Sequence, residues 1–66
     1  MKLKLNGTSS EHREGINVAE LLRSLKIRTE GVAVEVNLEI VKRQDYLKRK
    51  LNEGDSVEIV NFVGGG

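Results

Sequence analysis

The residues best suited to chemistry are the three glycines at positions 64–66, which follow an apolar, strand-like stretch. A carboxylate at Gly66 would lie at the end of a slim arm. Without Cβ atoms, such an arm can enter a narrow channel and adopt backbone conformations that are closed to other residues. The carboxylate is ionised at neutral pH and can attack the α-phosphate of ATP. A frayed end or an expression scar explains the glycines equally well, so they leave both interpretations open.

The strand expected immediately before these glycines has apolar side chains on both of its faces. Val57 and Ile59 share the face toward the core, whereas Val60 and Phe62 lie on the opposite face. An outward apolar pair indicates a contact site. The alternative is a small second cluster covered by Tyr46, and the sequence favours neither of the two.

No catalytic set accompanies the glycines. The chain has no cysteine, which excludes a thiol nucleophile, a disulfide framework, an iron–sulfur cluster and a zinc knuckle. Its single histidine, His12, is expected at a solvated strand edge and is not expected to bind a metal or act as a base. Glu11 and Glu14 are close in sequence, but no nucleophile or cofactor loop accompanies them. The pattern therefore predicts that the chain is not an enzyme.

Two basic clusters occur in the second half of the chain, at residues 42–43 and 48–50. Neither has interleaved aromatic residues, which are typical of nucleic-acid-binding surfaces. They are interpreted either as a solvated face or as a docking surface for an acidic partner.

Length and composition favour one small domain. Sixty-six residues with 38% hydrophobic and 32% charged side chains are typical of a globular module, and the net charge of +1 argues against a nucleic-acid partner. No apolar run approaches the roughly 18 residues of a membrane span. The first residues alternate and lack the apolar core of a signal peptide. A cytoplasmic location with no membrane partner is therefore expected.

Periodicity and turn residues give the elements that must position the tail. Alternation predicts strands, and Asn6-Gly7 predicts a tight hairpin whose polar second strand lies at a sheet edge. Asn17 and Glu20 form a capping-box pair before an apolar stripe at i, i+3, i+4 and i+7. The expected strands cover residues 2–6, 8–13, 32–37, 39–42 and 56–63, the helix covers residues 18–26, and a short helical turn covers residues 44–51. This order predicts an α+β domain with one main helix packed across a sheet.

At this level of detail the whole chain resembles the ThiS family of sulfur carrier proteins in thiamine biosynthesis. The motifs that carry the resemblance are the strand at 32–37, Glu39-Ile40-Val41-x-Arg43-x-x-Tyr46, Gly54-Asp55-x-Val57-Glu58-Ile59 and Gly65-Gly66. Two positions depart from the family pattern: Lys42 stands where proline is frequent, and Leu38 where glycine is common.

The resemblance implies a ubiquitin-like β-grasp fold, with the first and last strands adjacent and parallel in a mixed sheet. It also implies that an E1-like (ThiF-like) enzyme uses ATP to adenylate Gly66, while no cofactor is bound by the chain itself. A sulfur donor then supplies the sulfur of a thiocarboxylate, and a ThiG-like thiazole synthase takes that sulfur. In this scheme Gly64 and Gly65 thread the tail, and Val60 and Phe62 contact the partner.

Two alternatives stay open at this point. One is a molybdopterin-synthase small subunit, which uses the same tail chemistry with another acceptor. The other is a β-grasp interaction module or ubiquitin-like modifier. In each case we expect a domain at residues 1–63 that is monomeric alone, and a tail at residues 64–66 that is flexible until a partner binds it.

Overall fold

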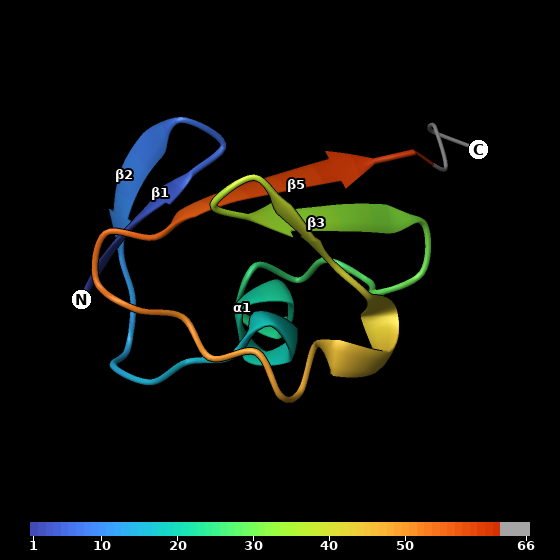
Figure 1. Ribbon diagram of the computed structural model, residues 1–66, viewed down its shortest axis with the longest axis horizontal. Coiled ribbons are helices and arrows are strands. Elements are labelled where there is room, and N and C mark those ends of the chain that lie inside the picture. Colours follow the sequence, from blue (N-terminus) through green and yellow to red (C-terminus); the bar gives the residue numbers. More distant parts are fainter. Residues whose placement is uncertain (63–66) are drawn as a thin grey trace.

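The computed structural model describes residues 1–62, and it consists of a five-stranded sheet with one α-helix on one of its faces (Figure 1). The expected boundary between domain and tail, after residue 63, lies outside the described residues. The elements in chain order are β1 (Lys2–Leu5), β2 (Thr8–Glu11), α1 (Val18–Ser24), β3 (Val32–Val36), β4 (Glu39–Val41), the 3-10 helix η1 (Arg43–Asp45) and β5 (Ser56–Asn61).

The strand order is β2-β1-β5-β3-β4, with β1 and β5 parallel in the interior of the sheet and the other neighbours antiparallel. The α+β class, the mixed sheet and the parallel pairing of the first and last strands are thus confirmed. Because β5 lies between β1 and β3, both of its edges are supported by other strands.

The hairpin between β1 and β2 forms at the predicted turn. Asn6 and Gly7 have φ values of 48° and 85°, a conformation that asparagine and glycine tolerate. The second strand lies at the sheet edge as expected, but it ends at Glu11 and does not reach residue 13. The chain turns there instead, and the amide of Ile16 donates to the carbonyl of Arg13 at 3.3 Å.

Helix α1 begins with the predicted capping box. The Asn17 side chain accepts from the backbone amide of Glu20 at 2.7 Å, and the Glu20 carboxylate accepts from the Asn17 amide at 3.0 Å. This backbone hydrogen bond lowers the pKa of Glu20 below its ordinary value. The helix ends at Ser24, two residues earlier than expected, because Lys26 adopts the left-handed region with φ 59°.

The core lies between α1 and the sheet and is aliphatic except for Tyr46. Its buried members are Leu3, Ile16, Val18, Leu21, Leu22, Val32, Val34, Val36, Val41, Tyr46, Leu51 and Val57. The alternative that Tyr46 covers an apolar pair on the opposite sheet face is therefore wrong. Burial raises the pKa of the Tyr46 hydroxyl above 10, and the nearby Arg43 only partly opposes this effect.

The segment after β4 differs from the expected helical turn at residues 44–51. Only η1 is helical, and a single 3-10 turn does not bring residues four apart onto one face. Leu51 is buried, whereas Leu47 is 72% exposed. Backbone pairing explains this path, because the Arg49 carbonyl accepts from the Val18 amide at 3.0 Å and ties the segment to the start of α1.

The tight turn between β3 and β4 contains one of the two departures from the family pattern. Asn37 and Leu38 have φ values of 52° and 71°, so Leu38 occupies a conformation that favours glycine. The Asn37 side chain ties this turn to the start of β5, since its oxygen accepts from the Ser56 amide at 3.0 Å. At the second departure, Lys42 has φ −69°, which a proline ring would also allow.

Candidate functional site

The two faces of β5 differ as the sequence predicted. Val57 is fully buried and Ile59 partly buried beneath α1, whereas Val60 and Phe62 are 57% and 67% exposed on the opposite face. The prediction that this apolar pair faces outward is confirmed. With Tyr46 in the core, the pair is open to solvent.

Neighbouring strands extend this exposed surface. Ala33 on β3 lies opposite Val60, and Glu35 lies between Glu58 on one side and Ile40 on the other. Ile40 is 72% exposed. Sequence analysis did not single out Ile40, although its place opposite an outward residue of β3 would have revealed it once the hairpin register was known.

We call this surface the outer face: it consists of Glu35, Ile40, Glu58, Val60 and Phe62 on the side of the sheet away from α1. Three exposed large apolar side chains on one small sheet face are typical of a protein-contact surface. The two carboxylates lie directly opposite each other on adjacent strands, where like charges are unfavourable. The outer face therefore carries features that do not serve folding.

The end of β5 is held on both sides, which fixes the direction in which the chain leaves the sheet. On one side, the Asn6 side chain accepts from the Ile59 amide at 2.7 Å and donates to the Ile59 carbonyl at 3.3 Å. On the other side, the Phe62 amide donates to the Gly31 carbonyl at 2.9 Å. The side-chain amide of Asn6 thus makes the hydrogen bonds to β5 that a neighbouring strand would make if β1 were longer. The sequence identified Asn6 only as a turn residue.

The predicted tail residues Gly64, Gly65 and Gly66 lie outside the described residues. Phe62, the last described residue, follows a strand that is anchored on both edges, and it is exposed like Val60. In the sequence, Phe62 precedes the first glycine of the predicted tail by two positions.

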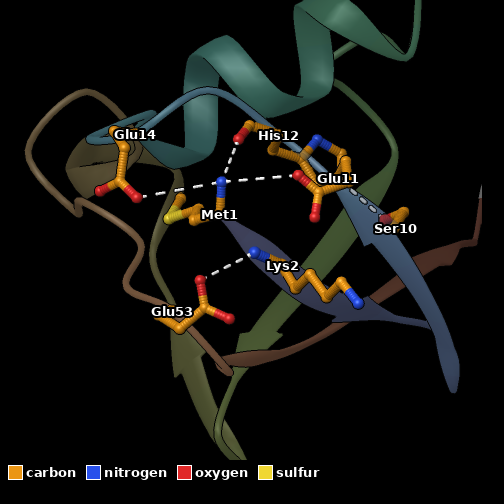
Figure 2. A network of polar contacts seen from close by, with 7 residues as sticks. All are labelled: Met1, Lys2, Ser10, Glu11, His12, Glu14 and Glu53. Carbon is orange, nitrogen blue, oxygen red and sulfur yellow. Dashed lines mark hydrogen bonds and ion pairs between the residues drawn. The ribbon is translucent and has the colours of Figure 1, made fainter.

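A separate polar network surrounds Met1, directly before the start of β1 (Figure 2). Its ammonium donates to the His12 carbonyl at 2.7 Å and lies 3.8 and 3.9 Å from carboxylate oxygens of Glu11 and Glu14. The His12 ring lies 2.7 Å from the Ser10 hydroxyl. These contacts tie the N-terminal strand to the turn before α1.

Among residues 1–62, no three histidine or acidic side chains come together in a way that could hold a metal ion. Over the same range, no helix is long and apolar enough to cross a membrane.

The mixed sheet with parallel first and last strands, the single helix across it and the exposed end of β5 define a ubiquitin-like β-grasp domain. The family model described as the ThiS family matches residues 3–66. This chain therefore belongs to the ThiS family.

Individual relatives agree with this assignment. The chain is 37% identical to the sulfur carrier protein ThiS of Bacillus subtilis over 97% of its own length and 98% of that protein. It is 44% identical to a thiazole synthase of Paramagnetospirillum magneticum, but it spans only 20% of the length of that relative. A crystal structure of the thiamine biosynthesis protein ThiS from Geobacter metallireducens superposes with a TM-score of 0.88 at 40% identity, with both chains fully covered.

Proposed function

We propose that this chain is a sulfur carrier in the biosynthesis of the thiazole part of thiamine, and that it is a protein substrate with no catalytic role of its own. The observation that carries the proposal is the exposed pair Val60 and Phe62 directly before a glycine tail, in a chain of the ThiS family. The pair supplies a surface for an activating enzyme. The tail supplies the group to be activated.

The proposed chemistry has two steps at Gly66. A carboxylate oxygen attacks the α-phosphate of ATP, pyrophosphate leaves, and a mixed anhydride with AMP forms. Sulfide (HS⁻) released by a donor then attacks the acyl carbon, AMP leaves and a proton is lost, which yields the thiocarboxylate without a change in oxidation state. The first step is needed because a carboxylate is a poor acyl donor and AMP is a good leaving group.

An E1-like (ThiF-like) adenylating enzyme would bind ATP and supply the acid–base groups for activation. This division of labour accounts for a chain whose described residues offer an exposed apolar surface for contact. Gly64 and Gly65 would thread the tail into the enzyme, because their lack of Cβ atoms suits a narrow channel.

A ThiG-like thiazole synthase is the proposed acceptor of the sulfur. Support comes from the relative named thiazole synthase, in which a stretch similar to this chain forms a fifth of the protein. If a carrier delivers its sulfur to a synthase, fusion of the two in one polypeptide is expected.

The decisive experiment alters the chain end and leaves the folded domain intact. Removing Gly66 withdraws the carboxylate by about 3.3 Å, and appending a residue converts it into an amide that cannot attack phosphate. Both changes should abolish pyrophosphate release with the adenylating enzyme and ATP, because misplacement near 1 Å already costs about a hundredfold. Gly65→Val should also fail, since a β-branched side chain is bulky and stiff.

Thr8→Ala on the distant edge strand is the matched control and should be adenylated normally. Circular dichroism should show the same fold for all variants. Mass spectrometry after addition of a sulfur donor identifies the product: exchange of oxygen for sulfur supports the carrier, and a stable amide adduct would indicate a modifier. Adenylation of a C-terminally extended chain at the unmodified rate would refute the proposal.

A further inference from the structure

A second surface, distinct from the end of β5, lies beside β4. A shallow hollow of about 390 Å³ is lined by Ile40, Lys42, Asp45, Lys48 and Arg49, among others. Three of these side chains are cations and one is a carboxylate, so the hollow is positively charged in a chain whose net charge is only +1. The two basic clusters noted in the sequence thus contribute to one surface.

The cations of this hollow are poorly neutralised by the protein itself. Within residues 1–62, neither Lys42 nor Lys48 is within ion-pair distance of a carboxylate, and the contact from Arg49 to Glu39 is long, at 4.0 Å. A long contact between exposed groups contributes little. The surface therefore offers positive charge to an external group.

One side of the β4 backbone is also free for pairing. Within residues 1–62, β4 is the last strand in the sheet order and has no neighbouring strand on that side, and the extended conformation continues through Lys42 with φ −69° and ψ 146°. Such an edge is a template to which an extended segment can add by main-chain hydrogen bonds. Ile40, 72% exposed, provides apolar area at the same edge.

The side chains around this edge are apolar on one face of the sheet and cationic on the other. Ile40 lies on the outer face, whereas Val41 points into the core, toward α1. Lys48 and Arg49 come from the segment that follows η1 and runs beside α1 (Figure 1). An extended segment along β4 would therefore present alternate side chains to an apolar surface on one side and to cations on the other.

We propose that the edge of β4 and the cationic hollow beside it form a docking strip for an extended acidic segment of a protein partner. Acidic side chains of that segment would face Lys48 and Arg49, and an apolar one would cover Ile40. The strip joins the outer face at Ile40, so one partner can reach both surfaces. The proposal does not depend on sulfur chemistry, because it concerns recognition alone.

Two features favour an acidic protein segment over a nucleic acid. The edge of β4 offers main-chain hydrogen-bonding groups that an extended polypeptide can pair with, and the lining of the hollow includes no aromatic side chain on which a base could stack. Cations beside an edge strand, such as Lys42 directly after β4, can instead serve only to prevent self-association. That role predicts an oligomer when they are replaced, which the docking strip does not.

The test is an NMR titration of the ¹⁵N-labelled full chain with a synthetic octapeptide. Glutamate occupies every second position of the peptide, and the other positions are serine except for a single leucine. Shifts should cluster at Ile40, Lys42 and Lys48, and they should weaken with added salt. The double variant Lys48→Glu and Arg49→Glu should raise the Kd about threefold or more. Lys42→Gln should act in the same direction, while Lys2→Glu, on β1, is the matched control and should leave binding unchanged.

Three results would overturn the proposal: no localised shifts, equal binding of a peptide with lysine in place of glutamate, or tighter binding of oligothymidine. Self-association of the double variant or of Lys42→Gln with an unchanged Kd would also overturn it, because it would show that these cations only protect the edge from pairing with a second copy. Circular dichroism of every variant confirms the fold. Adenylation of Gly66 is measured separately, so failure of either proposal is recognised independently of the other.

Discussion

The two faces of the sheet use the same strands for different purposes. The face toward α1 is aliphatic and closed to solvent, with Leu3, Val34 and Val57 almost completely buried. The outer face exposes Val60 and Phe62, although both are as apolar as the residues of the core. Adjacent positions along β5 thus alternate between the core and a surface that remains available for contact.

This difference shows how so short a chain can combine stability with recognition. A domain of about 60 residues buries only about 60% of the surface of its unfolded chain, so it must concentrate its apolar residues on one face. Apolar residues on the other face do not add to that core. Contact with the proposed partner would explain their placement at the end of β5, and each variant below separates the two roles.

The largest effect is expected in the core. Leu21 on α1 is fully buried, so Leu21→Ala removes packing and leaves a cavity. We expect a loss of about 2–5 kcal/mol in the free energy of unfolding, measured by urea denaturation. Binding to the adenylating enzyme should be normal for the fraction that is folded. A loss below about 1 kcal/mol would mean that the helix-side face does not carry the stability.

An intermediate effect is expected at Asn6, the turn residue whose side chain holds the backbone of β5 at Ile59. Asn6→Gly keeps a residue that tolerates positive φ but removes both hydrogen bonds to Ile59. The loss should be about 1–2 kcal/mol, from two hydrogen bonds of typical strength. Amide hydrogen exchange should accelerate at Ile59 more than at Val34. Uniform acceleration along the sheet would show that Asn6 supports the whole fold and not the end of β5.

Much of this architecture was predictable from local patterns. The capping box at Asn17 and Glu20 located the start of α1, and the alternation at residues 56–63 correctly assigned Val60 and Phe62 to the outer face. Both patterns depend on neighbours within a few residues, and such contacts are visible in a sequence.

The errors concern contacts between distant segments. The i, i+4 spacing of Leu47 and Leu51 indicated a helical turn, but backbone pairing to the start of α1 gives the segment an irregular path. Tyr46 is buried in the core because of that path. The outward position of Ile40 depends on the register of the hairpin between β3 and β4, and the contact of Asn6 with Ile59 depends on the strand order. Periodicity specifies neither of them.

Phe62 provides the counterpart to Leu21 on the outer face. Because its side chain is mostly exposed, Phe62→Ala should change stability by no more than about 0.5 kcal/mol. It should weaken binding to the adenylating enzyme about tenfold, as expected when a central aromatic contact is removed from an interface. Thermal melts paired with calorimetric titrations measure both quantities. A variant as unstable as Leu21→Ala, with normal affinity, would contradict the assignment of Phe62 to a contact surface.

The smallest effect is a gain in stability at the acidic pair of the outer face. Glu35 and Glu58 are direct cross-strand neighbours, and like charges in this position are unfavourable by roughly 0.2–1 kcal/mol. Glu58→Gln should therefore raise the free energy of unfolding by an amount in this range at low salt, and the gain should shrink in 1 M salt. In the background of Glu35→Gln the same change should give no gain, because the repulsion is already absent. An equal gain in both backgrounds would mean that the two carboxylates do not interact, and the outer face would then carry no electrostatic cost that a partner could relieve.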